Sequence, residues 1–262
     1  ARNIHIDGDY AYIVSLSTGF KIINIANPAE PKVVYYSGSN DIINDLAIKD
    51  NYLYIARNHA VQIVDITSLE IINTFSFQEN VLGIGIHGDY AYLGISNTGL
   101  QVLDISNPGE PVAGQLCAIN EKPVRVTISE NFAYLSCGEG DVHVVDISDP
   151  LNPDIFYTYN TPGDVMDTQV KGGYLYIADG YSGLQFRHIF SRDTHMVAGS
   201  FNRSCSPLAI CVQGNYAYMT NIWDGLIVLD ISDPESPVQV FQIPSQQAIP
   251  WIEICGNYLF TL

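Results

Sequence analysis

Two features common in other protein classes are missing from this 262-residue sequence: a long apolar run and a helical spacing of apolar residues. A membrane-spanning helix needs about 20 consecutive apolar residues, and no stretch approaches that length. Apolar residues do not recur every three or four positions over any long segment, as an amphipathic helix requires. We therefore expect an all-β chain with no direct membrane insertion.

Basic residues are scarce as well. The chain has 11 Lys and Arg against 28 Asp and Glu, a formal net charge of −17. Because a field of this sign repels phosphate groups, we expect no nucleic-acid partner and no docking on anionic membranes. The charge fits a soluble protein, or one that meets cations or basic partners.

Cysteine pairs and catalytic motifs are also absent. The five cysteines form no C-x-x-C pair, which excludes zinc ribbons and thioredoxin-like sites. Their odd number leaves at least one thiol free or paired outside this chain, and we expect Cys211 to be a buried apolar filler. The sequence lacks G-x-S-x-G, H-E-x-x-H, Walker A and EF-hand patterns. An enzyme can still assemble its site from distant segments, so these absences weigh only weakly against catalysis.

What the sequence does contain is an internal repeat of about 42 residues. Two aromatic residues separated by one position recur seven times, and they include most of the 17 tyrosines. The pairs are Tyr10/Tyr12, Tyr52/Tyr54, Tyr90/Tyr92, Phe132/Tyr134, Tyr174/Tyr176, Tyr216/Tyr218 and Tyr258/Phe260. Each pair follows a turn dipeptide such as Gly8-Asp9, and an alternating apolar stretch precedes the turn, so each repeat begins with a β-hairpin.

A third and a fourth strand complete the repeat. The third strand ends in Asp or Asn, and a turn bracketed by prolines separates it from the fourth, as in Asn107-Pro108 to Pro111. Four short strands per repeat leave no room for helices. In a β-propeller, four-stranded sheets are arranged radially around an axis, which leaves only short, protected strand edges. This is the fold that we expect.

The third strand carries the most uniform motif. It reads Leu/Val-x-Val-Ile/Leu-Asp-Ile-Ser, followed by Asp/Asn-Pro-x-x-Pro, as in the segments 100–111, 142–153 and 226–237. This signature resembles the LVIVD-repeat family over essentially the whole chain. The resemblance implies a propeller of the kind found in bacterial and archaeal surface or secreted proteins. It implies no activity, because the motif residues belong to the scaffold.

The repeats predict one propeller domain over residues 1–262. Blades are expected near 1–43, 44–81, 82–123, 124–165, 166–207 and 208–249, with a partial repeat at 250–262. Seven blades are favoured, in a parent chain that continues about 30 residues beyond Leu262, with six or eight blades as alternatives. The incomplete last blade could self-associate with a neighbouring chain through its strand edges.

Two polar columns recur in the repeat. The first, at the end of the third strand, reads Asn24, Asp65, Asp104, Asp146, His188 and Asp230; we expect it to be structural and to accept backbone N–H bonds. The second lies in the first strand, which lines the channel of a propeller. Its predicted channel-lining residues are His5, Asp45, Arg125, Asp167, Gln169 and Glu253. No cofactor is predicted; ordered water fits this column, and Ca²⁺ or another cation is the alternative.

Residues that break the repeat in loops are candidates for binding, because loops on rigid scaffolds carry function. Aromatic residues and Arg are typical anchors. The candidates are Arg57, His59, Tyr181, Arg203, Trp223, Asp224 and Trp251, with local loop packing as the alternative. Repeat five departs most from the pattern, and it lacks the proline-bracketed turn.

From these observations we expect a non-enzymatic interaction or scaffold module of a secreted or cell-surface protein. It would bind a protein or glycan on one loop face. Two alternatives stay open: a hydrolase or lyase with its site at the channel mouth, and a structural subunit of a surface assembly or filament.

Overall fold

The computed structural model describes residues 3–15, 19–38, 42–138, 140–189, 197–202, 206–245 and 247–261. Among these residues every regular element is a β-strand except one short 3-10 turn, η1 (Gly180–Ser182). No helix in the described part of the chain is long and apolar enough to cross a membrane. The all-β prediction is confirmed.

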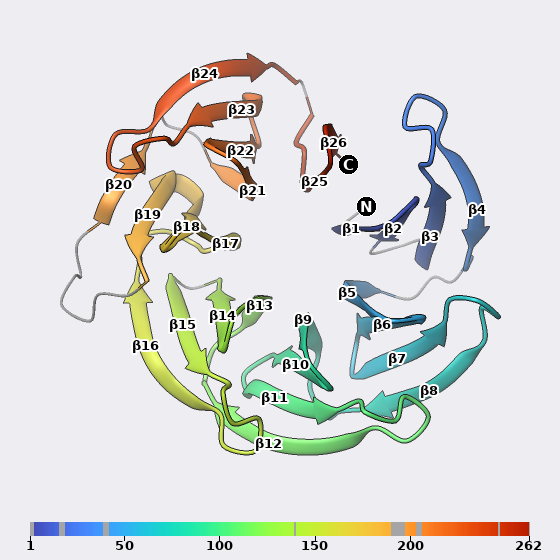
Figure 1. The fold of residues 1–262 in the computed structure, drawn as a ribbon. Coiled ribbons are helices and arrows are strands. Elements are labelled where there is room, and N and C mark those ends of the chain that lie inside the picture. Colours follow the sequence, from blue (N-terminus) through green and yellow to red (C-terminus); the bar gives the residue numbers. More distant parts are fainter. Residues whose placement is uncertain are drawn as a thin grey trace. The chain divides into compact units, whose positions relative to one another are not determined.

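Six four-stranded antiparallel sheets form the blades, and the strand order within each follows the sequence (Figure 1). Blade one contains β1 (Asn3–Asp7), β2 (Tyr10–Ser15), β3 (Gly19–Asn24) and β4 (Lys32–Tyr36). Blade two contains β5 (Ile43–Lys49), β6 (Tyr52–Arg57), β7 (Ala60–Asp65) and β8 (Ile71–Ser76). Blade three contains β9 (Val81–His87), β10 (Tyr90–Ile95), β11 (Gly99–Asp104) and β12 (Val112–Ala118).

The remaining blades follow the same plan. Blade four contains β13 (Pro123–Ser129), β14 (Phe132–Cys137), β15 (Asp141–Asp146) and β16 (Asp154–Asn160). Blade five contains β17 (Asp167–Lys171), β18 (Tyr174–Ala178), β19 (Leu184–His188) and β20 (Val197–Phe201). Blade six contains β21 (Pro207–Gln213), β22 (Tyr216–Asn221), β23 (Gly225–Asp230) and β24 (Val238–Ile243). A two-stranded sheet of β25 (Ile252–Cys255) and β26 (Tyr258–Thr261) comes last.

The blade count corrects the sequence-based prediction. Six complete blades are present rather than the favoured seven, and six was one of the alternatives. The reason is visible in the repeats themselves: the last aromatic pair belongs to β26, and the described residues hold no third and fourth strand for that repeat.

The chain divides into two compact units, which we describe separately. Unit 1 comprises Ala1–Leu135 with His143–Tyr157, and unit 2 comprises Ser136–Val142 with Thr158–Leu262.

The hairpin register recurs from blade to blade. The second aromatic residue of each pair lies opposite the middle residue of the first strand, as in Tyr12 with His5 and Tyr176 with Gln169. The turns require positive φ, which Gly8 adopts at 54° and Asp50 at 53°. These are the turn dipeptides from which the hairpins were predicted.

The second aromatic column forms part of the core. Tyr12, Tyr54, Tyr92, Tyr134 and Tyr176 are all buried. Burial raises the pKa of Tyr54 and of Tyr92 to about 12, with smaller contributions from neighbouring ionisable groups. The aromatic rings of these tyrosines therefore pack in the core.

Apolar faces of successive blades pack against each other within each unit. In unit 1, Tyr12 and Ile22 of blade one share a cluster with Leu53 and Ile55 of blade two. In unit 2, Phe186 of blade five shares a cluster that includes Met219 of blade six. The period-two alternation of the strands places these side chains on one face of each sheet.

Two of the proline-bracketed turns also bridge blades, because each lies against the fourth strand of the preceding blade. In unit 1, Asn73 Nδ2 of β8 donates to the Gly109 carbonyl of the next repeat's turn at 2.9 Å. In unit 2, a Cβ on Gly199 of β20 would lie 2.1 Å from the Pro234 carbonyl oxygen. We call this contact turn-on-strand packing.

A shallow groove marks the same arrangement between blades three and four. It is lined by Gln115 and Leu116 of β12 and by the turn residues 151–154. Here the turn leaves open space beside the strand rather than filling it.

Candidate functional site

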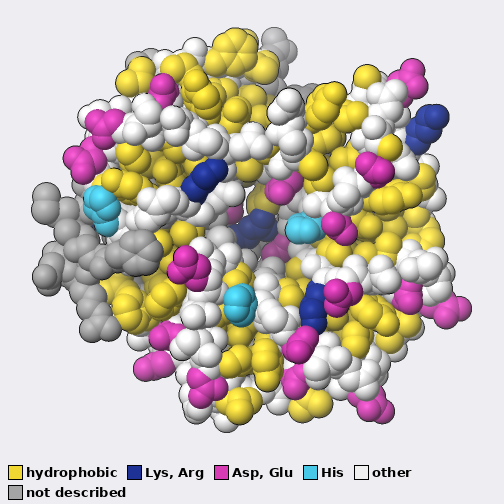
Figure 2. Space-filling view, in the orientation of Figure 1, with side chains coloured by type: hydrophobic (Ala, Val, Ile, Leu, Met, Phe, Trp, Pro, Cys, Tyr) yellow, Lys and Arg dark blue, Asp and Glu magenta, His cyan; other side chains and the backbone are white. Residues whose placement is uncertain are grey.

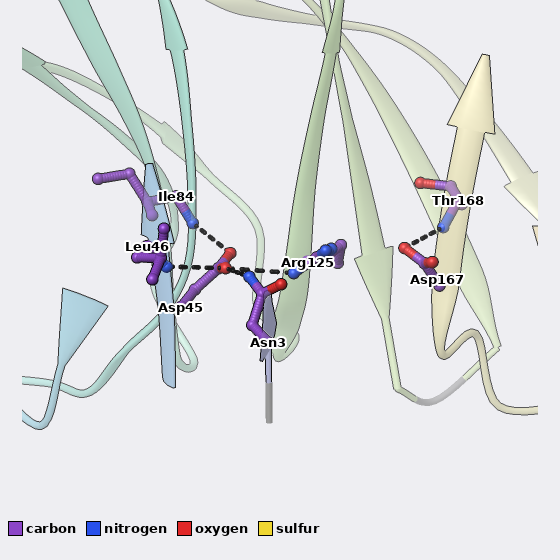
Figure 3. Close-up of polar contacts among 7 residues, drawn as sticks. All are labelled: Asn3, Asp45, Leu46, Ile84, Arg125, Asp167 and Thr168. Carbon is purple, nitrogen blue, oxygen red and sulfur yellow. Dashed lines mark hydrogen bonds and ion pairs between the residues drawn. The ribbon is translucent and has the colours of Figure 1, made fainter. Parts of the chain in front are cut away.

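The predicted channel column contains a buried carboxylate in unit 1, that of Asp45 in β5. This side chain is 2% exposed. Its Oδ1 accepts the amide N–H of Leu46 at 2.9 Å, and its Oδ2 accepts that of Ile84 at 3.1 Å (Figure 3). Asn3 Nδ2 and Arg125 Nη1 also donate to Oδ1, the latter at 3.2 Å. The carboxylate therefore joins the first strands of four blades.

Asp167 in unit 2 repeats the same contact. Its carboxylate accepts the amide N–H of Thr168 and that of Ile210, both at 3.0 Å. Ile210 lies in the first strand of blade six, just as Ile84 lies in the first strand of blade three. Each Asp thus bonds the first strand of the next blade, and we call this contact an inter-blade latch.

The neighbouring column position makes a second type of latch in unit 2. Gln169 Oε1 accepts the amide N–H of Val212. Cys211 makes the equivalent contact with the backbone N–H of Ile254. Burial, with a smaller contribution from the Glu253 carboxylate, raises the pKa of the Cys211 thiol to about 11. Cys211 is buried, as predicted for an apolar filler.

The latches give the polar column a structural use that the sequence did not reveal. Asp45 and Asp167 direct their carboxylates at backbone amides of the next blade, and four donors meet at Asp45. A cation at this column stays an untested alternative to ordered water, and it would have to compete with those donors.

His5 lies beside the Asp45 latch, in surroundings that lower the pKa of its ring. Burial lowers the pKa of His5, and the positive charge of Arg125 acts in the same direction. The carboxylates of Asp45 and Asp7 oppose this shift without cancelling it.

The column at the end of the third strand is structural, as predicted. Its Asp carboxylates accept the amide N–H two residues further on, which fixes the start of the following turn. These bonds measure 2.7 Å for Asp65, 2.9 Å for Asp104, 2.9 Å for Asp146 and 2.8 Å for Asp230, and Asn24 makes the same bond at 3.1 Å. Hydrogen bonds from Ser106 and Ser232 lower the pKa values of Asp104 and Asp230.

Trp223 is held out to solvent by an ordered turn in unit 2. Its side chain is 70% exposed. The buried Asn221 accepts the amide N–H groups of Trp223 and Asp224 on its Oδ1, both at 2.6 Å. Asn221 Nδ2 donates to Asp224 Oδ2 at 3.0 Å, and Gln242 Nε2 donates to the Asp224 carbonyl at 3.1 Å. Three side chains therefore fix the backbone that carries the indole.

Tyr181 occupies the middle of η1 and is 80% exposed. The turn is closed by backbone bonds from Ser182 N to Asp179 O at 2.8 Å and from Gly183 N to Gly180 O at 3.0 Å. Among the described residues, η1 packs against β21, whose first residue Pro207 pairs with Asn221 at the end of β22. The Tyr181 and Trp223 turns therefore border the same strand.

A buried polar network supports the Tyr181 turn, and the sequence reading missed it. Asp179 accepts Thr161 Oγ1–H at 2.6 Å and Gln185 Nε2–H at 2.5 Å. Arg187 Nη2 donates to Gln185 Oε1 at 2.9 Å. Burial raises the pKa of Asp179, although the bonds from Thr161 and Gly163 and the charge of Arg187 lower it.

A signal for this network was present in the sequence. Arg187 occupies a third-strand position that is apolar in the other repeats, where the residues are Ile23, Val64, Leu103, Val145 and Leu229. A charge in an apolar column requires a buried partner.

The remaining loop candidates lie elsewhere. Arg57 is half-buried at the end of β6 in unit 1, and His59 is exposed, with its Nδ1 bonded to the Gln78 carbonyl at 2.8 Å. Trp251 is only 8% exposed, which removes it from the proposed surface. Arg203 lies outside the described residues. Tyr181, Trp223 and Asp224 are thus the candidates that one unit brings together.

The LVIVD repeat family matches residues 1–36, 42–69, 80–117, 123–161, 162–185 and 208–243. The chain belongs to the LVIVD-repeat family. No curated protein matches the sequence.

Solved structures of similar fold include unrelated propellers. The RRP9 WD40 repeats share 10% identity and a TM-score of 0.81, covering 99% of this chain and 86% of that one. A functionally unknown protein from Desulfotomaculum acetoxidans DSM 771 shares 17% identity and a TM-score of 0.74, covering 92% and 84%. The computationally designed Ika8 protein shares 11% identity and a TM-score of 0.76, covering 99% and 79%. These likenesses concern the fold alone.

Proposed function

We propose that this LVIVD-repeat propeller is a non-enzymatic interaction module that binds a protein or glycan through Tyr181, Trp223 and Asp224. The observation that carries the proposal is the exposure of two large aromatic side chains on hydrogen-bonded turns that border one strand. The repeated residues supply the scaffold, so the exceptions to the repeat supply the recognition surface.

The chemistry of the two turns suits a ligand with apolar faces and polar edges. An exposed indole and a phenol stack on the C–H faces of a sugar ring or on apolar protein side chains. Asp224 adds a carboxylate beside the indole, which can accept a hydroxyl or an amine proton.

Order in the turns reduces the entropy cost of binding. Asn221 fixes the Trp223 backbone in the free protein, and the bonds within η1 do the same for Tyr181. Since the ligand then immobilises little beyond the two side chains, more of the contact energy appears as affinity.

The location of the protein is part of the same proposal. The family resemblance and the net charge of −17 support a secreted or cell-surface site. Protease digestion of intact cells that express the native gene tests this, because a surface protein is degraded while the cell envelope stays sealed.

The binding test uses the two tryptophans of the chain. Trp223 is exposed and Trp251 is buried, so Trp223 should report ligand binding by a change in fluorescence. The wild-type protein is applied to a glycan array and a peptide array. The strongest hits are then titrated by calorimetry as well as by fluorescence, because a variant without Trp223 lacks the fluorescent reporter. We expect the double variant Tyr181→Ala/Trp223→Ala to bind these hits at least tenfold more weakly.

A matched control separates the proposed surface from exposed aromatic residues in general. Tyr216 and Tyr258 are also exposed, but each begins the second strand of its hairpin. The variant Tyr216→Ala/Tyr258→Ala should keep wild-type affinity. Unchanged binding in the Tyr181/Trp223 variant, or no wild-type binding on either array, would count against the proposal.

A further inference from the structure

Each of the two aromatic turns in unit 2 has a carboxylate beside its exposed ring. Asp224 follows Trp223 directly in the chain. Asp164 lies against the Tyr181 turn, because a Cβ on Gly180 would lie 3.6 Å from the Asp164 Cβ. The Asp164 side chain is exposed, and that of Asp224 is half-buried. The same two groups, an exposed aromatic ring and a carboxylate, therefore occur together at both turns.

These two carboxylates have no cation beside them in the described part of the chain. No described Lys or Arg forms an ion pair with Asp164 or Asp224, and the bond from Asn221 occupies only one oxygen of Asp224. The basic residues described in unit 2 are engaged elsewhere. Lys171 donates to a backbone carbonyl at 3.4 Å, and the buried Arg187 bonds a neighbouring side chain. Both carboxylates can therefore accept a proton donor from another molecule.

The chain itself shows how an exposed ring can hold a cation. In unit 1, Lys21 Nζ lies 5.4 Å from the centroid of the Tyr36 ring, and Tyr36 is 50% exposed. The negative face of an aromatic ring attracts a positive charge in this position. Among the described residues, no Lys or Arg lies over the ring of Tyr181 or Trp223. These two rings are therefore accessible to a cation from outside the described chain.

The charge of the whole chain favours the same type of partner. The formal net charge is −17. Figure 2 shows Asp and Glu side chains spread over the blades on one face, with Lys and Arg side chains sparse among them. A field of this sign attracts a basic partner and speeds its encounter with the protein, whereas it repels an anionic one. A neutral sugar gains nothing from the field, so the charge favours a cationic ligand over a neutral glycan.

We propose that the partner of this surface is a protein segment with exposed Lys or Arg side chains. One basic side chain stacks on Trp223 and pairs with Asp224, and another stacks on Tyr181 and pairs with Asp164. Each contact combines the attraction of a ring face with that of a carboxylate. The inference rests on the proposed function, because it names the chemistry of the partner for that same surface.

The first experiment tests the charge of the partner. The strongest hit of the peptide array is titrated by calorimetry beside a copy of the same peptide in which Gln replaces every Lys and Arg. We expect a hit rich in Lys or Arg, and an affinity about tenfold lower for the Gln copy. The affinity for the basic peptide should also fall when sodium chloride is raised from about 0.1 M to about 1 M, because the Debye length then shortens from about 10 Å to about 3 Å.

The second experiment tests the two carboxylates. Asp224→Asn and Asp164→Asn each remove one charge and keep the shape of the side chain, and each should weaken binding of the basic peptide by about fivefold. Asp233→Asn is the matched control. It makes the same change in charge at the turn between β23 and β24, at the other end of blade six, where it should leave the affinity unchanged. Asn27 and Asn107 already occupy the equivalent position in other repeats, so this substitution preserves the turn.

The outcomes separate this inference from the function on which it rests. Thermal unfolding of every variant first confirms that it folds. Wild-type binding only to neutral glycans or uncharged peptides, weakened by Tyr181→Ala/Trp223→Ala, overturns the basic partner and leaves the proposed surface standing. No binding on either array overturns both. Equal loss of affinity in Asp233→Asn and Asp224→Asn also overturns the inference, because the general field of the protein would then account for the binding.

Discussion

The Asp45 carboxylate accepts the amide N–H of Ile84 at 3.1 Å, and this bond ties the first strand of blade two to that of blade three. Asp167 and Ile210 make the same bond between blades five and six. A polar side chain that sequence reasoning assigned to a channel therefore serves as a connection between repeats.

Removing the Asp45 latch should destabilise the protein. Asp45→Ala deletes a buried carboxylate that Arg125 and two backbone amides bond, so we expect a loss of about 3 kcal/mol in the free energy of unfolding. Urea denaturation followed by circular dichroism measures the change. Glu79→Ala, at an exposed acidic residue, should change stability by less than about 0.5 kcal/mol. Equal effects of the two substitutions would refute the latch.

Turn-on-strand packing in unit 2 can be tested by substituting Gly199, which lies at the contact. A Cβ at Gly199 would lie 2.1 Å from the Pro234 carbonyl oxygen, so Gly199→Ala should cost roughly 1–3 kcal/mol. Gly109→Ala is the matched control, since its nearest neighbour would be Asn107 Oδ1 at 3.5 Å. Thermal melts of the two variants should separate clearly, and a Gly199→Ala protein as stable as Gly109→Ala would contradict the packing.

The buried carboxyl of Asp179 predicts a pH effect on stability. Its pKa is raised in the fold, chiefly by burial, so the native state holds the proton more tightly than the unfolded state. This residue's contribution to stability is therefore greatest at low pH and is lost as pH rises through the folded pKa. The free energy of unfolding of wild type, minus that of Asp179→Asn, should therefore increase as pH falls.

The Asp179→Asn variant should keep the network intact. Its Oδ1 can accept the Gln185 bond while its Nδ2 donates to the Thr161 hydroxyl, whose own proton then goes to the Gly140 carbonyl at 2.7 Å. The measurement is a set of urea titrations between about pH 4 and pH 8. If the two proteins show parallel pH profiles, Asp179 does not titrate in the predicted direction.

Thiol reactivity should rank the cysteines by exposure. Cys117, Cys137 and Cys211 are buried, and Cys255 is partly exposed. In a Cys205→Ser background, a disulfide reagent at pH 8 should modify Cys255 first and Cys211 last, because burial and Glu253 disfavour the Cys211 thiolate. Cys255→Ser should remove the fast phase, and a fast phase that survives would contradict this order.

Repetition explains how much the sequence could predict. The hairpin turns, the aromatic pairs and the proline-bracketed turns each recur, so their shared pattern predicted the strands and the structural role of the Asp column. Both Asp45 and Asp167 break their column, which reads Asn3, Gly83, Arg125, Ala209 and Trp251 elsewhere. What their carboxylates bond depends on the next blade's backbone, and a single strand cannot show that.

The loop candidates show the same limit. Tyr181 and Trp223 look alike in sequence to Trp251, yet two are exposed and one is buried. Exposure depends on which neighbouring loop covers a residue, and loops do not follow the repeat. Arg187 could have been found from its own column, because a charge among apolar residues implies a buried counter-charge nearby.

The latches also determine how the molecule should come apart. The backbone bond of each one joins a repeat to the repeat that follows, so its energy belongs to an interface between blades rather than to a blade alone. In such an array, stability accumulates as interfaces between repeats are added. Hydrogen exchange should therefore be slow in the latched first strands β5, β9, β17 and β21, and the loss of one latch should speed exchange in both strands that it joins.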